Sequence, residues 1–444
     1  MSQKQNIMGT MPMGQLVLHM SWPIILSMLM QAIYNLVDSI FVARISDAAF
    51  LALSYAYPIQ TLLIAFNVGL GVAFSATLSK RLGEKKLSEA SSVVLHGLLL
   101  FLCCWFLFFL FGLFLAPAFL RSCTDTAEVA ALGADYLRIV CCCSMGVCLQ
   151  FPIERSLQAT GHPAGFMLVQ GSGALLNLIL DPFFIFTLGL GVRGAAIATV
   201  IGQILGACIG LCLLYRIRRQ LALDLRGFRL QTQVLQEIGV IAVPAILMQS
   251  LASLMSLGLN AILRLWSETA VWVLGAYFKI QSFVFMPIYS VNNALIAIIS
   301  YNYGAQQKDR AAQAIHVGLA LAVGTGLLGG LLLWFTASPL LTACFDAGGA
   351  ALALGVPSLR YTCLSFPIAA VAIIYSAAFQ SLGYSRYSLV ISLLRCVLLL
   401  LPISLLFILT LPSYVFLSFL LTELGSSAIS LFMYRGVRKN TLLP

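Results

Sequence analysis

The sequence predicts an all-α integral membrane protein with twelve transmembrane helices in two pseudo-symmetric six-helix lobes. Three observations lead to this fold class. Of the 444 residues, 61% are hydrophobic and only 9% are charged, whereas soluble domains are about 45–50% apolar. Apolar runs long enough to cross a bilayer follow one another along the chain. The second half of the chain also repeats the first.

The apolar runs define the predicted spans in chain order. A bilayer core about 30 Å thick takes about 20 helical residues to cross, and a helix satisfies its backbone hydrogen bonds internally. The spans lie near residues 15–43, 48–78, 92–118, 127–154, 164–189, 193–216, 236–264, 269–303, 312–336, 350–382, 386–410 and 412–434. The first run is too long for the core of a signal peptide, so we expect it to remain in the mature protein.

A displacement of 221 or 222 residues aligns the two halves. The matching pairs are Pro23 and Pro244, Gln60 and Gln281, Ser79 and Ser300 at 221, and Pro117 and Pro339, Arg138 and Arg360, Gln158 and Gln380 at 222. We predict an N-terminal lobe over residues 1–216, a cytoplasmic linker over 217–236 and a C-terminal lobe over 237–444. Because each copy holds an even number of spans, both enter the membrane in one orientation, and rocking about their seam would give alternating access.

The positive charges are distributed unevenly between the loops on the two sides. With the N-terminus inside, the outer loops hold only Arg44, Arg121, Arg193 and Arg264, whereas the cytoplasmic segments hold most other Lys and Arg residues. This bias places both termini in the cytoplasm and predicts a multi-pass protein of the plasma membrane. It also explains the net charge of +10 without a nucleic-acid partner.

Cysteines and sequence motifs give no support to a metalloprotein or an enzyme. Most of the twelve cysteines, such as Cys141, Cys142 and Cys143, lie within spans, where we interpret them as small buried hydrophobes. A disulfide between Cys123 and Cys344 is the less favoured alternative. The sequence has no HExxH, GxGD or Gly-Lys pair, so we predict no intramembrane protease, no Walker loop and no enzymatic cofactor.

Four polar residues of the first half form a candidate ion-coupling cluster. Asp38 lies near the outer end of the first span, and Asn177 and Asp181 share one face of the fifth, one helical turn apart. Thr199 enters from the outside on the sixth span. Such oxygens at one depth would bind Na⁺, or the two carboxyls would share a proton.

The repeat provides a control for this cluster. The equivalent residues of the second half are Leu259, Leu399, Ile403 and Leu421. A structural need of the repeat unit would be expected in both copies, so the asymmetry favours ion coupling over structural pairing. The alternative is that Asp38 is only a helix-end residue near water.

Other charges also lie within the predicted spans: Asp135, Arg138, Lys279, Arg360, Arg395 and Glu423. Arg138 and Arg360 are repeat equivalents, and Asp135 is placed to pair with Arg138 at i, i+3, so we interpret them as structural. Lys279 and Glu423 lie near mid-membrane, where they either neutralise one another or line the seam. The sequence leaves both possibilities open.

Small residues and prolines indicate where helices pack and bend. Gly202, Gly206 and Gly210 recur at helical spacing in the sixth span and predict close helix packing. Prolines within spans remove a hydrogen bond and kink the helix. We expect Pro23, in the first span, to mark a bend that changes during transport.

Four segments of the chain resemble the multidrug and toxic compound extrusion (MATE) family of transporters. They are SWPIILSMLMQAIYNLVDSIFVAR in the first span, ERSLQATGHP before the fifth, NLILDPFFIFTLGLGVRGAAIATVIGQ, and ISYNYGAQQKDR after the eighth. No segment is decisive alone, but their order at the matching spans is specific. The resemblance covers nearly the whole chain.

The resemblance implies twelve helices in two lobes and exchange of Na⁺ or H⁺ for organic, often cationic, compounds. It places the family's first-lobe ion site at Asp38, Asn177, Asp181 and Thr199, with Tyr34 beside it and Pro23 at the bend. The chain departs from members that carry a glutamate in the seventh span, because residues 238–263 contain no acid. This departure favours coupling through the first lobe.

Together these observations predict a secondary active multidrug efflux transporter that works by alternating access. Its partners would be the bilayer and small organic substrates, with no obligate protein partner. The alternative is a flippase for a lipid-linked oligosaccharide, and a channel fits the twin repeats less well.

Overall fold

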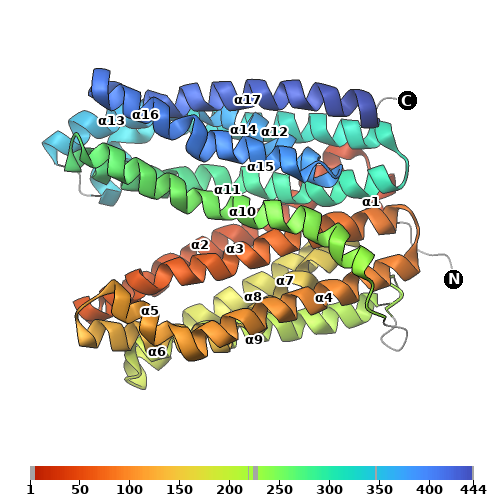
Figure 1. The fold of residues 1–444 in the computed structure, drawn as a ribbon, viewed down its shortest axis with the longest axis horizontal. Helices are drawn as coiled ribbons and strands as arrows, with labels where there is room; N and C mark the ends of the chain where they lie inside the picture. The colour runs from red at the N-terminus through yellow and green to blue at the C-terminus, as the bar shows by residue number, and fades with distance from the viewer. Residues whose placement is uncertain (1–5, 219, 224–228, 346–347, 443–444) are drawn as a thin grey trace. The chain divides into compact units, whose positions relative to one another are not determined.

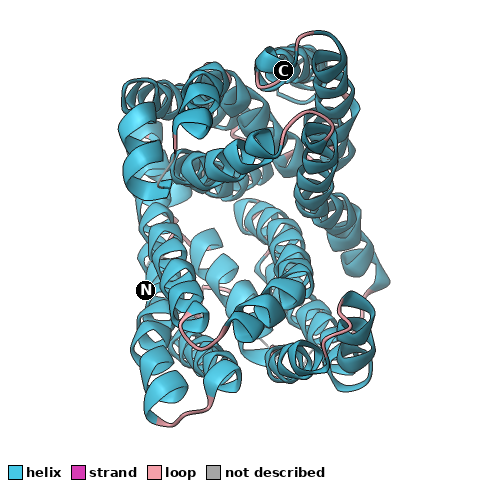
Figure 2. Ribbon diagram, turned by 90° about the vertical axis from the view of Figure 1, so that its left-hand side faces the viewer, coloured by secondary structure: helices cyan, strands magenta, loops and turns pink. Residues whose placement is uncertain are grey.

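The computed structural model describes residues 6–218, 220–223, 229–345 and 348–442 (Figure 1). Throughout these ranges the regular secondary structure is helical, with no strand (Figure 2). Ten helices are long and apolar enough to cross a membrane, and two bent helix pairs bring the total to twelve within the described residues. The predicted all-α fold class with twelve spans is therefore confirmed.

The first half of the chain contains the helices α1 (Ile7–Thr10), α2 (Met13–Ala43), α3 (Asp47–Gly83), α4 (Leu87–Leu110), α5 (Ala116–Cys123), α6 (Ala127–Cys142), α7 (Met145–Ala159), α8 (Pro163–Pro182) and α9 (Gly191–Ile217). The second half contains α10 (Thr232–Arg264), α11 (Glu268–Gly304), α12 (Lys308–Phe345), α13 (Gly349–Cys363), α14 (Phe366–Ser381), α15 (Ser385–Leu393), α16 (Leu400–Thr410) and α17 (Leu417–Val437). Wider π-helical turns interrupt or extend several of them: η1 (Phe111–Leu115), η2 (Phe183–Thr187), η3 (Leu394–Leu398) and η5 (Arg438–Leu442). A 3₁₀ turn, η4 (Pro412–Tyr414), precedes α17.

The fourth and tenth spans are broken, although the sequence predicted each as one continuous helix. α6 and α7 meet at a bend of 44°, and α13 and α14 at 46°. A serine hydroxyl binds the end of the first helix at each break: Ser144 Oγ donates to the carbonyl of Cys141 at 2.7 Å, and Ser365 Oγ to that of Thr362 at 2.6 Å. The same carbonyls also accept the backbone amides of Ser144 and Ser365, at 3.3 and 2.9 Å, so each hydroxyl adds a second hydrogen bond at the end of the helix.

The chain packs into two compact units. Unit 1 comprises Met1–Ile7 and Trp22–Ile246, and unit 2 comprises Met8–Ser21 and Leu247–Pro444. The chain therefore passes from one unit to the other within α2 and again within α10, in each case within a few residues of an equivalent proline, Pro23 or Pro244. Both helices continue through that proline.

Glycines set the approach of α8 and α9 in unit 1. A Cβ atom on Gly202 would lie 2.6 Å from the carbonyl oxygen of Gly173, and one on Gly206 would lie 2.8 Å from that of Val169. Any side chain there would force the helices apart, so the predicted close packing of the sixth span is confirmed. This packing holds the residues of α8 and α9 in a fixed register.

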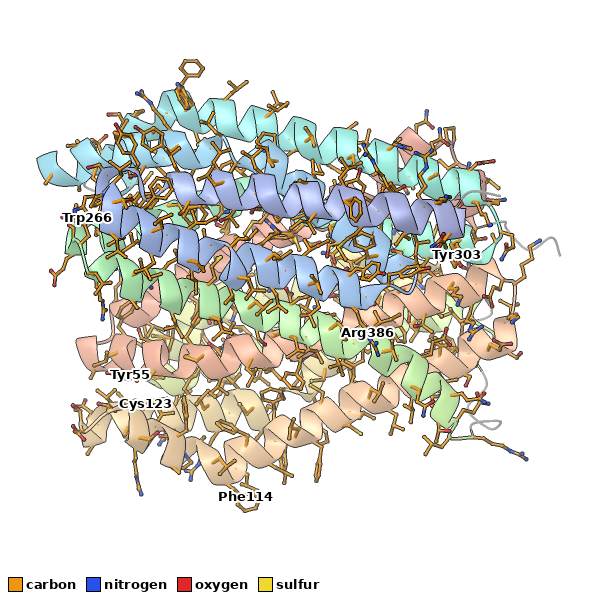
Figure 3. All side chains as sticks on the ribbon, turned by 45° about the horizontal axis from the view of Figure 1, so that its top comes forward. Tyr55, Phe114, Cys123, Trp266, Tyr303 and Arg386 are labelled. Carbon is orange, nitrogen blue, oxygen red and sulfur yellow. The ribbon has the colours of Figure 1, made fainter. Side chains whose placement is uncertain are left out.

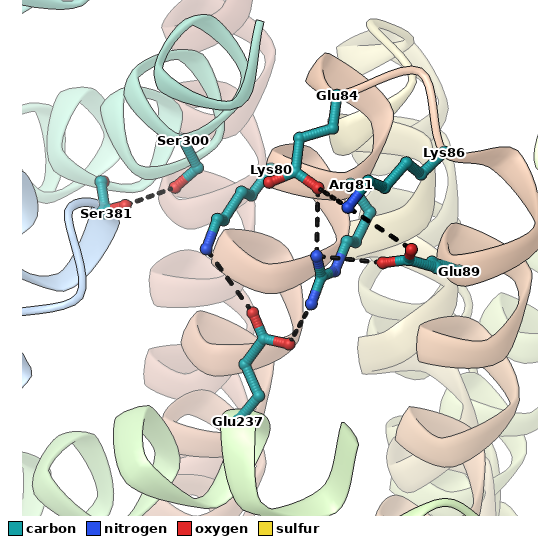
Figure 4. A network of polar contacts seen from close by, with 8 residues as sticks. All are labelled: Lys80, Arg81, Glu84, Lys86, Glu89, Glu237, Ser300 and Ser381. Atoms are coloured by element: carbon teal, nitrogen blue, oxygen red, sulfur yellow. Dashed lines mark hydrogen bonds and ion pairs between the residues drawn. The ribbon is translucent and has the colours of Figure 1, made fainter. Parts of the chain in front are cut away.

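A network of charges closes the turn between α3 and α4 in unit 1 (Figure 4). Arg81 lies 3.0 Å from carboxylate oxygens of both Glu84 and Glu89, and 2.6 Å from Glu237 at the start of α10. Partial burial raises the pKa of Glu84, but hydrogen bonds and charges from Arg81 and Lys86 outweigh this effect, and the net shift is downward. The network ties the first part of α10, which belongs to unit 1, to the end of α3.

The equivalent turn of unit 2 fastens the start of the chain by a different set of bonds. Arg310 donates to the backbone carbonyls of Met8 and Met11 at 3.1 and 2.9 Å, and its Nε donates to Asn302 Oδ1 at 3.1 Å. Asn302 also donates to Met8. Asn302 and Arg310 are the repeat equivalents of Arg81 and Glu89.

Large apolar side chains cover much of the outer surface of the helices, as expected where the solvent is lipid. Phe114, labelled in Figure 3, is 68% exposed, and Leu328 and Leu409 are more exposed still. All twelve cysteines are free thiols, so the alternative disulfide between Cys123 and Cys344 is not formed.

Candidate functional site

The structure brings three of the four predicted cluster residues into one hydrogen-bonded group in unit 1. Asn177 and Asp181 lie one turn apart on α8, and both are almost completely buried. Asn177 Nδ2 donates to Asp181 Oδ1 at 3.1 Å and to Thr199 Oγ1 on α9 at 3.3 Å. The glycine packing of α8 on α9 makes this bond between the helices possible.

Asp38 approaches the same group from α2. Its charge interacts electrostatically with that of Asp181, and both carboxylates interact with Tyr34, which lies one turn before Asp38. Tyr136 on α6 also interacts with both acids, and its hydroxyl accepts a hydrogen bond from Gln60 at 2.7 Å. Sequence reasoning did not single out Tyr136, although it lies one residue after the charged Asp135.

Several oxygens of this cluster are buried without a hydrogen-bond partner. They are Asp38 Oδ1, Asn177 Oδ1 and Asp181 Oδ2. Burying an acceptor without a donor costs about 1–3 kcal/mol of desolvation free energy, and the cost is larger when the group is charged. Carboxylate, amide and hydroxyl oxygens suit a hard cation such as Na⁺, and two neighbouring carboxylates also suit a shared proton. The cluster therefore offers the oxygen ligands that a hard cation or a shared proton requires.

A cavity of about 60 Å³ adjoins the cluster within unit 1. Its lining includes Tyr34, Asn177 and Thr199 near the cluster, and Gln150 and Glu154 on α7. The sequence analysis assigned no role to Glu154 and did not single out the glutamines. The polar residues at helical spacing within the fourth span, Gln150 and Glu154, were the signal that would have found this part of the cavity.

The pairing predicted for Asp135 is wrong. Asp135 Oδ2 accepts hydrogen bonds from Arg193, at 3.0 Å from Nε and 2.7 Å from Nη2, rather than pairing with Arg138. Arg138 is exposed. The sequence analysis counted Arg193 among the outer-loop residues, but α9 begins at Gly191, so Arg193 lies in the first turn of α9 and reaches Asp135 in the middle of α6.

In unit 2 the charge of Glu423 is neutralised by Arg395, not by Lys279. The guanidinium of Arg395 on η3 binds the carboxylate of Glu423 on α17 through bonds of 2.7, 2.9 and 3.1 Å. Lys279 is exposed, with its Nζ 5.9 Å from the ring centre of Phe345. Arg360 is also exposed and donates to the backbone carbonyl of Trp334 at 3.3 Å.

Pro23 lies inside α2, where its missing N–H removes the helical hydrogen bond to the carbonyl of His19, four residues earlier. Ser27 Oγ donates to the carbonyl of Pro23 at 2.8 Å, and Ser27 is fully buried. The structure places Pro23 where α2 enters unit 1. Its role as a bend that changes during transport stays a prediction.

Comparison with known proteins gives one consistent family. The sequence profile of the MatE family matches residues 23–183 and 244–406, one match in each half of the repeat. A FAD transporter of Shewanella oneidensis is 28% identical over 404 residues, which cover 88% of each chain. The multidrug export protein MepA of Staphylococcus aureus is 23% identical over 385 residues, covering 86% of this chain and 85% of MepA.

A solved structure has the same fold. It is that of a multidrug resistance MATE family transporter in an outward-facing conformation, with a TM-score of 0.94, 22% sequence identity and coverage of 99% of both chains. At this identity the likeness concerns the fold. The double match of the family profile, across most of both halves, establishes the wider relationship: the chain belongs to the MATE family of membrane transporters.

Proposed function

We propose that this protein is a secondary active efflux transporter that exchanges Na⁺ or H⁺ for organic, cationic compounds by alternating access. The observation that carries the proposal is the set of buried oxygens without partners at Asp38, Asn177 and Asp181. A Na⁺ bound there would be coordinated by these oxygens, whereas a proton on one carboxyl would supply an O–H donor to a neighbouring oxygen. The ion therefore stabilises whichever conformation holds the cluster together, and this differential binding shifts the conformational equilibrium.

The membrane arrangement forms part of the proposal. Both termini lie in the cytoplasm, and the protein resides in the plasma membrane. The chain is divided into a lobe of residues 1–216, a linker of 217–236 and a lobe of 237–444. The bias of Lys and Arg toward one set of loops supports this topology.

Multidrug export is favoured as the transport activity by the name of one relative, MepA.

Export of flavin adenine dinucleotide is the second candidate, because the more similar of the two relatives is described as a FAD transporter. FAD carries a negatively charged diphosphate, so a protein that exports it needs basic groups at its binding surface. A flippase for a lipid-linked oligosaccharide is the third activity to assay.

Reconstitution tests these alternatives directly. Purified protein in liposomes is given a Na⁺ or a proton gradient, and movement of a fluorescent cationic dye is compared with movement of FAD. We expect one gradient to drive dye movement, and Asp38→Asn and Asp181→Asn each to reduce it by about tenfold or more, which corresponds to about 1.4 kcal/mol or more in a barrier. If a gradient drives movement of FAD but not of the dye, FAD export replaces multidrug export as the proposed activity.

A further inference from the structure

Glu154 is a buried carboxylate of the unit 1 cavity that the proposed ion cluster does not use. It is 2% exposed, and its Oε1 accepts a hydrogen bond from Gln150 Nε2 at 2.8 Å. The neighbouring Arg155 interacts with it electrostatically, while Arg155 Nη1 donates to Gln158 at 3.0 Å. A carboxylate held inside a membrane protein is costly, and such residues mark ion pathways when they face a cavity.

One continuous cavity connects Glu154 with the ion cluster at a different depth. Glu154 lies five residues before the end of α7 at Ala159, and Asn177 lies fourteen residues after the start of α8 at Pro163. These offsets correspond to about 7.5 and 21 Å of helix. Because a short turn joins α7 to α8, the two groups are separated by about 13 Å in depth.

Amide side chains line the cavity between these two ends. Gln170 Nε2 donates to Gln31 Oε1 at 2.7 Å, and Gln203 contributes from α9. Gln170 Oε1 and Asn177 Oδ1 are buried without partners, so each has an acceptor position for a water or a cation. A polar cavity of about 60 Å³ has room for several waters, because one water needs about 10–15 Å³.

This polar lining occurs in the first half alone. At the repeat displacements, the equivalents of Gln31, Gln150, Glu154, Gln170 and Gln203 are Ala252, Ala372, Ser376, Ser392 and Gly425. The ion cluster has the same asymmetry, since its equivalents are Leu and Ile. The polar lining and the ion cluster therefore occur together in the first half and are both absent from the second half of the sequence. This joint occurrence indicates that they serve the same function.

We propose that Glu154 is the acceptor through which the coupling cation leaves the cluster toward the cytoplasm. The inference rests on the proposed ion-coupled function and its topology. Na⁺ would move from the Asp38 and Asp181 oxygens along the amide oxygens to the Glu154 carboxylate. For H⁺, an O–H bond on an aspartic acid breaks, the proton passes through cavity water, and an O–H bond forms on Glu154. The titratable side chains lining the cavity are Tyr34 and Glu154, and Arg155 adjoins Glu154.

The test separates ion binding from ion movement in the full-length protein. Ion movement is measured in liposomes as radioactive Na⁺ uptake or as proton flux reported by an enclosed pH dye. Ion binding is measured in detergent as the rise in Tm that the ion produces, because a ligand of the folded state stabilises it. The variants are Glu154→Gln, Glu154→Asp, Asp181→Asn and, as a matched control, Glu128→Gln at an exposed acid.

We expect Glu154→Gln to keep the ion-dependent rise in Tm and to lose ion flux by about tenfold or more, equivalent to about 1.4 kcal/mol or more in a barrier. Glu154→Asp should retain most of the flux, Asp181→Asn should lose both signals, and Glu128→Gln should lose neither. Undiminished flux in Glu154→Gln would overturn this inference alone. Loss of the Tm rise in Glu154→Gln would also overturn it, because Glu154 would then belong to the binding cluster. If the wild type moves neither ion, the proposed function and this inference both fall.

Discussion

The fifth and sixth spans of the two halves are repeat equivalents, yet they bury charge in opposite ways. In unit 1, α8 and α9 hold Asn177, Asp181 and Thr199, and two of these three residues have an oxygen without a partner. In unit 2, the equivalent helices hold Arg395 and Glu423, which satisfy each other through bonds of 2.7 to 3.1 Å.

The difference separates a site that needs a ligand from one that does not. An unpaired buried oxygen lowers the stability of the folded protein, and a bound cation removes this destabilisation. A bidentate pair of a guanidinium and a carboxylate is complete in itself, and breaking it leaves one charge stranded. The position of Arg395 is that of Gly173 in the first half, so one helix face became a close glycine contact in one copy and an ion pair in the other. The following predictions test this contrast in order of decreasing effect on stability.

Breaking the ion pair of unit 2 should have the largest effect. Glu423→Gln leaves the largely buried Arg395 guanidinium, whose side chain is 17% exposed, without its counter-charge, which costs at most about 3–5 kcal/mol of unfolding free energy. The loss of unfolding free energy is measured by unfolding the protein in detergent and following the transition by circular dichroism. The matched control is the double variant Arg395→Met with Glu423→Leu, which should recover most of the loss because no stranded charge remains. Unchanged stability of Glu423→Gln would remove the distinction between the two sites.

Opening the glycine contact of unit 1 should have the next largest effect. In Gly202→Ala the new methyl group meets the Gly173 carbonyl at 2.6 Å, so α8 and α9 must separate at a cost of about 1–3 kcal/mol. The separation also weakens the bond from Asn177 to Thr199 and should lower ion affinity. Gly436→Ala is the control, because nothing lies within 4 Å of its Cβ position. Equal stability of both variants would show that the contact is not tight.

Neutralising a carboxylate of the ion cluster should raise the free energy of unfolding, whereas Glu423→Gln lowers it. Asp181→Asn keeps the acceptor for Asn177 but removes repulsion with Asp38 and a charged oxygen that lacks a partner. Without coupling ion, we expect a gain of about 1 kcal/mol. Tm in ion-free detergent is the measurement. A loss comparable to that of Glu423→Gln would indicate that the cluster is structural.

The charge network beside α10 should contribute least. The pKa of Glu84 is lowered, so its contribution is present above the ordinary pKa of glutamate and is lost as the pH falls through the lowered value. Glu84→Gln should cost less than about 1 kcal/mol at neutral pH, and the difference from wild type should vanish in acid. Denaturant unfolding from neutral to acidic pH checks this, with Glu128→Gln as a control that should show no such difference. A difference that persists in acid would mean that the glutamate charge is not responsible.

The sequence determined the helical membrane fold, the number of spans and the repeat, because hydropathy and helical period are local properties of the chain. It also placed Asn177 and Asp181 on one face, since a helix fixes the direction of residues four apart. Aligning the second half of the chain with the first also showed, before any contact was known, that Asp38, Asp181 and Thr199 have no polar equivalents.

The tertiary structure decided which side chains meet across helices. Asp135 pairs with Arg193, and Glu423 with Arg395, because the rotation and depth of each helix are set by packing, as where Gly202 lies against the Gly173 carbonyl. The bends of 44° and 46° within the fourth and tenth spans likewise appear only in the structure, because hydropathy gives no signal for them. The cavity that joins Glu154 to Asn177 exists only because α7, α8 and α9 bring residues distant in the chain to one space.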